Sequence, residues 1–320
     1  MPKLLTRTHV PLGSCISMTS IQLSYSGVLV GTSTGHLFLI TYVKGRAKIS
    51  APKGIVEEKS PVVELTICKN QLMVMRNSGL LQIYDLWLDE SSASPCCLQL
   101  ICEHSVDECP KFRPLFLDTE TLFVVRNSVL HNLLNKKEQV PLASNTFLGI
   151  AQLSTHSTQF VLYGDGLTLW KWMRTCPATQ LQSYLLDLYK YAAIGTEVSP
   201  CILDFFVHQG FIFCATNMGL LLYFPETQIS EPPTTDGKIY PMVYPTICLT
   251  TRRLLFWDNL IVPCGGYGLE LLSLKVSENA TPDITGITVI TFEDSSTCGA
   301  VSSGLLWICT GGAGVCLLSD

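Results

Sequence analysis

The sequence predicts an all-β protein, a seven-bladed β-propeller closed by an N-terminal strand that completes the last blade. Three observations predict it. A hairpin unit, made of two apolar runs around a glycine-containing or polar turn, occurs seven times. The spacing of these turns fits the about 40–50 residues of a four-stranded propeller blade. A further β-like segment, residues 3–10, precedes the first unit.

The hairpin turns are the clearest sign of the repeat. They fall at Gly35, Gly79, Val129, Gly166, Gly219, Gly268 and Gly314, with gaps of 37 to 53 residues. Glycine suits a tight hairpin because it adopts positive φ without a Cβ clash. The second and third copies share Arg-Asn-Ser, at residues 76–78 and 126–128. This identity strengthens the case for repetition of one blade.

Another apolar segment precedes each hairpin and predicts the inner strand of each blade. These segments are Ser17–Leu23, Val62–Ile67, Arg113–Leu117, Leu148–Leu153, Ile202–Val207, Thr246–Thr250 and Gly299–Ser302. The runs are apolar on both faces, as expected where blades pack face to face, whereas solvated antiparallel strands alternate. A more polar outer strand, such as Ala47–Ile49, would complete each blade. We therefore expect residues 1–320 to form one domain.

The last blade lacks an outer strand in sequence order. Residues 3–10 are predicted to supply it and so close the ring, which removes two open sheet edges.

Two segments depart from the repeat. Residues 85–111 predict an outer strand and a surface loop. Residues 179–193 predict an amphipathic helix, because Leu181, Tyr184, Leu185 and Leu188 fall at i, i+3, i+4 and i+7. Packing of this helix on its own blade is the alternative to a role in docking a partner.

Composition limits the classes of partner. The 320 residues are 47% hydrophobic and 15% charged, with a net charge of −5. The charge balance and the lack of long Lys/Arg clusters argue against nucleic-acid binding. No signal peptide or integral membrane segment is predicted, so the 14 cysteines are interpreted as reduced thiols of a cytoplasmic protein. The spacing of Cys96, Cys97, Cys102 and Cys109 fits no paired zinc pattern.

No catalytic signature occurs, so we predict no enzyme activity, no cofactor and no metal site. The glycine clusters at 265–268 and 311–314 lead into strands rather than helices, which favours hairpin turns over phosphate loops. His36, Arg76, Arg126 and His131 lie at the turns and are predicted partner contacts, together with the four helix residues. If several of the four turn residues and Asp165 converged in one pocket, an enzyme with an active site at the rim of the channel would be favoured instead.

The units resemble divergent WD repeats. Tyr84-Asp85 and Trp170-Lys171 stand where a Trp-Asp dipeptide often ends the third strand, although neither blade has the usual Gly-His dipeptide. Residues 29–35, 59–65 and 71–86 are similar to the opening of citron-homology propellers of vesicle-tethering subunits and some kinases. That resemblance implies a cytosolic role in protein transport, with a small GTPase or other complex subunits as partners. It implies no catalytic residue.

The sequence thus predicts a non-catalytic protein-interaction scaffold, a subunit of a larger cytosolic complex. The alternatives are the channel-rim enzyme and a substrate receptor of a ubiquitin ligase. The latter has only Trp170-Lys171-Trp172-Met173-Arg174 to support it, and this segment lacks the Asp of the adaptor motif Trp-Asp-x-Arg.

Overall fold

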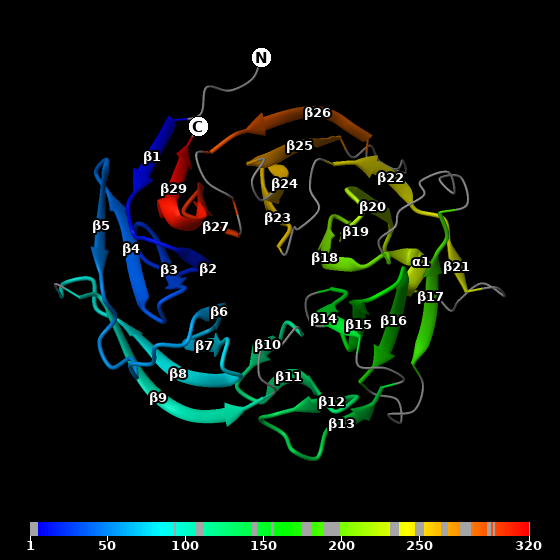
Figure 1. Cartoon of the computed structure of the whole chain (residues 1–320), viewed down its shortest axis with the longest axis horizontal. Coiled ribbons are helices and arrows are strands. Elements are labelled where there is room, and N and C mark those ends of the chain that lie inside the picture. The colour runs from blue at the N-terminus through cyan, green and yellow to red at the C-terminus, as the bar shows by residue number, and fades with distance from the viewer. Residues whose placement is uncertain are drawn as a thin grey trace.

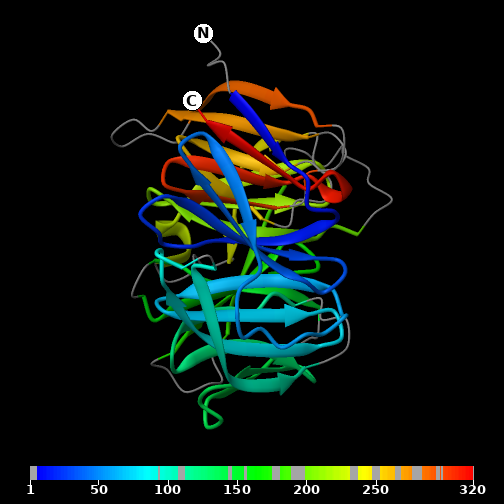
Figure 2. The same ribbon diagram turned by 90° about the vertical axis from the view of Figure 1, so that its left-hand side faces the viewer.

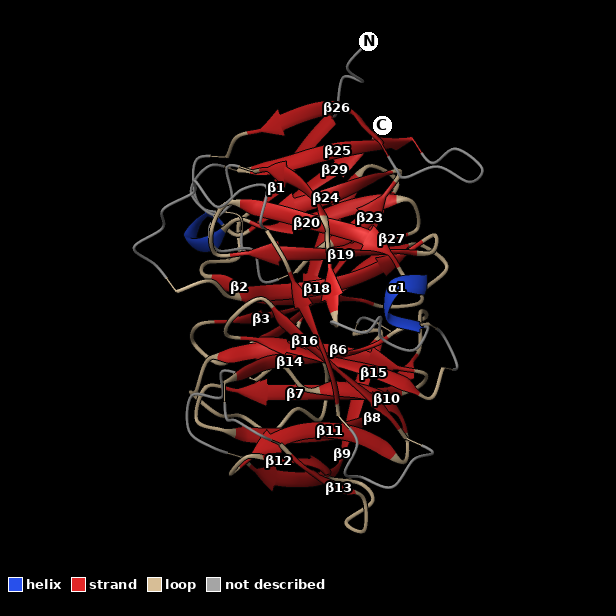
Figure 3. Cartoon of the chain, turned by 90° about the vertical axis from the view of Figure 1, so that its right-hand side faces the viewer, coloured by secondary structure: helices blue, strands red, loops and turns tan. Residues whose placement is uncertain are grey.

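Seven β-sheets stand around a central axis in the computed structural model, as Figure 1 shows. The structure describes residues 6–92, 94–106, 112–142, 146–154, 157–174, 181–188, 199–230, 237–246, 253–263, 268–275, 283–292, 296 and 298–319. Successive strands of a blade lie further from the axis, and the side views show the stacked blades edge-on (Figures 2 and 3). The predicted seven-bladed all-β propeller is confirmed.

The first four blades follow the chain from the inner to the outer strand. Blade 1 contains β2 (Cys15–Ser20), β3 (Ser26–Thr32), β4 (Leu37–Val43) and β5 (Arg46–Ser50). Blade 2 contains β6 (Val62–Cys68), β7 (Gln71–Arg76), β8 (Leu80–Leu88) and β9 (Cys96–Ser105). Blade 3 contains β10 (Leu115–Asp118), β11 (Thr121–Arg126), β12 (Val129–Asn132) and β13 (Gln139–Pro141). Blade 4 contains β14 (Phe147–Gln152), β15 (Gln159–Gly164), β16 (Thr168–Met173) and β17 (Gln182–Leu186), extended by β21 (Lys238–Ile239).

The remaining blades complete the ring. Blade 5 contains β18 (Ile202–His208), β19 (Phe211–Thr216), β20 (Leu220–Pro225) and β22 (Met242–Pro245). Blade 6 contains β23 (Leu255–Trp257), β24 (Asn259–Pro263), β25 (Leu269–Lys275) and β26 (Asp283–Ile290). Blade 7 contains β27 (Gly299–Ser302), β28 (Leu305–Cys309), β29 (Val315–Ser319) and β1 (Thr6–Val10). The helices described are short: α1 (Thr227–Ser230) and the 3₁₀ turn η2 (Gly311–Ala313).

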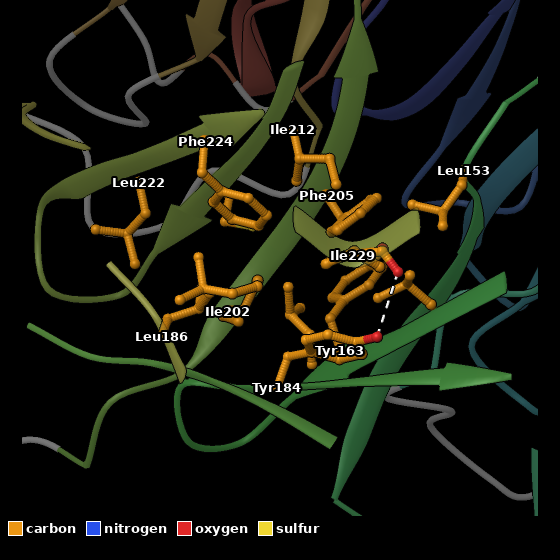
Figure 4. Packing of buried hydrophobic residues seen from close by; sticks show 14 of the residues in the cluster. Leu153, Tyr163, Tyr184, Leu186, Ile202, Phe205, Ile212, Leu222, Phe224 and Ile229 are labelled. Carbon is orange, nitrogen blue, oxygen red and sulfur yellow. Dashed lines mark hydrogen bonds between the residues drawn. The ribbon is translucent and has the colours of Figure 1, made fainter. Parts of the chain in front are cut away.

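The core lies between the blades rather than at the axis. Seven clusters of buried side chains are present, one for each pair of adjacent blades. The cluster between blades 4 and 5 includes Tyr163, Tyr184, Ile202 and Phe224 (Figure 4). Because both faces of the middle strands are buried in this way, their sequences are apolar without alternation.

Closure of the ring follows the sequence prediction. β1 pairs antiparallel with β29 as the outer strand of blade 7, from Thr6 opposite Ser319 to Val10 opposite Val315. Side chains also join blade 7 to blade 1. Trp307 Nε1 donates to Ser26 Oγ at 2.9 Å, and Ser26 Oγ donates to the Ser302 carbonyl at 2.9 Å. The first and last parts of the chain are therefore held together by a strand ladder and by a buried hydrogen-bonded link.

Positive φ angles mark most of the predicted turns, for example 86° at Gly35, 81° at Gly79 and 106° at Gly314. In blade 3 the turn is at Asn127 and Ser128, with φ of 52° and 58°, one to two residues before the predicted Val129. Asparagine tolerates the left-handed region better than most residues, so this turn needs no glycine.

Two predicted elements are wrong. Residues 182–186 form strand β17, not part of a helix, and Tyr184 and Leu186 face inward while Ser183 and Leu185 face solvent. Pairing with β16 and this period-two burial override the helical spacing. Residues 179–180 and 189–193 of that prediction lie outside the described part. The inner strand of blade 6 is Leu255–Trp257 rather than Thr246–Thr250, of which 247–250 are not described.

Candidate functional site

Of the predicted rim residues, His36 and Asp165 lie at the turns between the second and third strands of their blades. Arg76 and Arg126 end the second strands β7 and β11, and His131 lies on the third strand β12, opposite Val124. Because the blades are equivalent meanders, these turns share one face of the ring. His36 and Arg126 are exposed, His131 is half-buried and Asp165 is exposed. Among the described residues, no hydrogen bond or ion pair joins any two of these four, and the His36 ring contacts Thr34, with Nδ1 2.9 Å from Oγ1. The structure thus spreads these residues around the rim.

Arg76 is the exception among the rim residues because its side chain is fully buried. Its Nη1 donates to the carbonyls of Gly35, Glu58 and Ser60 at 3.0, 3.1 and 3.2 Å. Its Nε donates to Gln82 Oε1 at 3.0 Å. The guanidinium of Arg76, on blade 2, therefore holds both the turn of blade 1 and the segment that joins blades 1 and 2. It presents no surface to a partner.

Gly35 is expected to be intolerant of a side chain. A Cβ there would collide with the carbonyl oxygens of Glu58 and Ser60, and φ is 86°. Gly35→Ala should lower the free energy of unfolding by about 2 kcal/mol or more, since strain and displacement of the Arg76 acceptors add. Gly45→Ala is the matched control: φ is 79°, but no atom lies within 4 Å of its Cβ, so about 1 kcal/mol is expected. Equal losses in urea unfolding would contradict the prediction.

The predicted docking residues at 181–188 divide between core and surface. Tyr184 is buried, and its hydroxyl donates to the Ile229 carbonyl at 3.3 Å (Figure 4). Leu181 and Leu188 pack partly buried against neighbouring clusters. Only Leu185 is well exposed, at 43%. Of these four, Leu185 offers the most area to a partner.

A network of charged side chains crosses the central channel, and sequence analysis missed it. Arg113, two residues before β10, places Nη1 3.0 Å from Asp204 Oδ1 on β18 and Nε 3.6 Å from Glu64 Oε1 on β6. Arg253, before β23, places Nη1 3.7 Å from the same Glu64 oxygen and donates to the Met18 carbonyl at 2.8 Å. Inner segments of blades 1, 2, 3, 5 and 6 are thereby joined across the axis.

Asp204 is the buried centre of this network, with 3% of its side chain exposed. Besides Arg113, it accepts a hydrogen bond from the Leu254 amide at 2.5 Å and one from the Tyr163 hydroxyl at 3.4 Å. A Cβ at Gly149 would overlap that hydroxyl, so glycine is needed where Tyr163 reaches Asp204. The carboxylate is therefore well satisfied despite its burial, as buried charges must be.

Burial and neighbouring charges set the pKa values in the network. Burial raises the pKa of Asp204, and the Arg113 guanidinium and the Leu254 amide oppose that shift. Burial lowers the pKa of Arg113, but the carboxylates of Glu64 and Asp204 outweigh it and raise it overall. Burial and the Asp204 charge raise the pKa of Tyr163, which keeps its hydroxyl a donor. The hydrogen bonds and ion pairs of the network hold the inner segments together, and its two guanidiniums present positive charge to the channel.

A repeated backbone feature positions these groups. β2, β6, β14 and β18 each have a register irregularity at the same place, immediately before Ser17, Glu64, Gly149 and Asp204. A bulge re-aims the following side chain, and bulges are common beside functional sites. The sequence does carry a signal: Val-Val-Glu-Leu and Ile-Leu-Asp-Phe put one acidic residue at the same position of two otherwise apolar strands.

Two cavities open beside the inner strands. One, of about 420 Å³, is lined by Arg113, Asp204, Arg253, Ser20 and aromatic residues of β18 and β23. The other, of about 480 Å³, lies between blades 4 and 5 and includes His208, whose ring stacks on Phe256 at 3.8 Å. Neither contains a predicted rim residue. The channel, not the rim turns, is where polar groups converge.

The cysteines behave mainly as apolar core residues. Cys214, Cys309 and Cys316 are buried as predicted, while Cys264 and Cys109 lie outside the described residues. Burial raises the pKa of Cys96 to about 12 and of Cys201 to about 11, which keeps both as thiols. Within the described ranges, no three His, Cys, Asp or Glu side chains form a metal-binding group. No helix in these ranges has the length and apolarity to cross a membrane.

Known proteins match this chain by shape alone. No family model matches the sequence, and no curated protein does. The structure is similar to that of Raptor from Chaetomium thermophilum, with a TM-score of 0.65 and 10% identity over 96% of this chain, which spans 28% of that chain. It is equally similar to a chain of the mitotic checkpoint complex, with a TM-score of 0.65 and 11% identity over 98% of this chain and 93% of that one. The chain therefore has the fold of a seven-bladed β-propeller, which these two proteins share.

Proposed function

We propose that this propeller is a protein-interaction scaffold, and that a partner protein adds an extended segment to the outer edge of β26. The observation that carries the proposal is the character of this strand. β26 is eight residues long, its only charged residue is Asp283, and it is the last strand of its sheet. Ile287 and Val289 on it are 54% and 49% exposed. A long, apolar, unpaired edge is a template for another strand.

Five other outer edges of the ring are protected, at least in part. β5 carries Arg46 and Lys48, whereas β13 and β22 are short and end in proline. Charge, proline and short length each discourage strand addition. Extended segments of the same chain cover part of two further edges: Lys53 bridges to Cys97 at one end of β9, and β21 pairs in parallel with two residues of β17. The chain thus already binds extended segments at its outer edges, and among the described residues none occupies that of β26.

We further propose that the protein is a subunit of a larger cytosolic complex. A role in membrane trafficking, with a small GTPase as a partner, is supported by the resemblance of residues 29–86 to citron-homology propellers. His36, Arg126, His131 and Leu185 remain predicted partner contacts. Separation of the rim residues weakens the channel-rim enzyme alternative, and no feature of the described blades favours a ubiquitin-ligase substrate receptor.

The test is quantitative affinity purification of the full chain from native extract. The double variant Ile287→Lys/Val289→Lys should lose a stoichiometric partner, because lysines on an edge strand oppose strand addition. Ile101→Lys is the matched control, since Ile101 lies on outer strand β9 and is 46% exposed. In the purified complex, hydrogen exchange of the β26 amides should slow. Retention of all partners by the double variant, or unchanged exchange at β26, would overturn the proposal.

A further inference from the structure

We propose that the channel cavity is a binding site for a carboxylate attached to an apolar body. The cavity volume of about 420 Å³ lies within the about 300–1,000 Å³ of small-ligand sites. Its lining combines two arginines, Arg113 and Arg253, with Phe206 and Phe256. This site is independent of the β26 edge.

Both arginines have unused donors at the cavity. A guanidinium has five N–H donors. Among the described residues, the Arg113 guanidinium donates to Asp204 and also interacts with the Tyr163 hydroxyl, and the Arg253 guanidinium donates to the Met18 carbonyl. The side chains are 29% and 24% exposed. N–H groups of both guanidiniums are therefore available to a ligand in the channel.

The carboxylates of Asp204 and Glu64 do not pair with all the N–H donors of the two arginines. Asp204 is already saturated by Arg113, Leu254 and Tyr163. Glu64 Oε1 lies 3.6 and 3.7 Å from the two guanidiniums and is buried without a hydrogen bond to a described residue. These distances exceed those of hydrogen bonds. One carboxylate is thus shared loosely between two cations, and a second could bind in the bidentate geometry that arginine favours.

The same arrangement selects a carboxylate over a phosphate. Glu64 and Asp204 already contribute negative charge beside the two arginines, so a dianion would be repelled more strongly than a monoanion. The aromatic side chains favour an apolar body beside the charged group. Either a free organic acid or a glutamate side chain of a partner peptide has this chemistry.

Calorimetric titration of the full chain tests the site with 3-phenylpropionate as the probe. We expect saturable one-to-one binding, and binding at least about ten-fold weaker for 3-phenylpropanamide, which has the same shape without the charge. Arg253→Gln should weaken binding about ten- to hundred-fold. Arg174→Gln is the control, because Arg174 pairs with Glu138 at 2.7 Å and lies outside the cavity lining. Ile287→Lys/Val289→Lys should bind as wild type, which separates this proposal from the previous one.

A second variant tests the site without changing any charged residue of the network. Ser20 lines the cavity and is exposed, so Ser20→Phe should block binding while the chain stays folded. The peptide Ac-Phe-Glu-Phe-NH₂ is the second arm: tighter binding than 3-phenylpropionate indicates a partner glutamate, and weaker binding indicates a free acid. No saturable binding of either probe up to about 10 mM, wild-type affinity in Arg253→Gln, or equal binding of inorganic phosphate would overturn the proposal.

Discussion

Removal of residues 1–10 should open the ring and abolish cooperative folding. The deletion takes away β1, its five-pair ladder with β29 and the buried Val10. It also exposes the edge of β29, whose Cys316, Leu317 and Leu318 are buried in the intact ring. Lost ladder hydrogen bonds and apolar contacts amount to about 5 kcal/mol or more. That is comparable with the whole stability of about 5–15 kcal/mol of a typical domain.

Size-exclusion chromatography and thermal unfolding measure the result. The deleted chain should elute as aggregates or as an expanded monomer without a sharp transition. A shorter deletion, residues 1–5, leaves all of β1 and should behave as the intact chain. A monomeric protein with the wild-type Tm after removal of residues 1–10 would show that closure by β1 does not determine stability.

Asp204→Ala should be the most damaging single substitution in the channel. It leaves the Leu254 amide and the Tyr163 hydroxyl without their acceptor and deprives Arg113 of its closest partner. Removing one member of a buried ion pair costs about 3–5 kcal/mol, and the partial exposure of Arg113 places the expected loss at about 3 kcal/mol. Urea unfolding, with the midpoint and m-value both recorded, measures it.

Asp187→Ala is the control, because it removes an ion pair of similar length that is more exposed to solvent. Asp187 Oδ2 lies 3.1 Å from Lys238 Nζ, close to the 3.0 Å between Asp204 and Arg113, but the lysine is 40% exposed. Exposed pairs contribute about 0–1 kcal/mol. If the two alanine variants were equally stable, burial would not be what makes the Asp204 network important.

Repetition made the ring predictable, whereas individual strand ends depended on tertiary contacts. Seven similarly spaced turns constrain the architecture, since each blade must bury its apolar faces against the next. Residues 182–186 form a strand, although the spacing of Leu181, Tyr184, Leu185 and Leu188 also fits a helical period. Pairing with β16 decided the outcome, and no local propensity reveals such pairing.

The channel network was harder to foresee than the fold. Glu64, Arg113, Asp204 and Arg253 are distant in sequence and meet only because the inner segments converge on the axis. Positions next to turns point to rim residues such as Arg76, but the N–H donors of Arg76 bind backbone carbonyls of the same chain. A charged residue inside an apolar inner strand was the more informative signal, because burial requires such a charge to have a partner.

The closing ladder also determines how the ring would respond to mechanical force. Thr6 pairs with Ser319, and the ladder runs from there to Val10 opposite Val315. Tension applied between Thr6 and Ser319 acts at one end of this antiparallel pair, across the hydrogen bonds rather than along the strands. The bonds would therefore break one after another, and the ring would peel open at low force while blades 2 to 6 kept their packing.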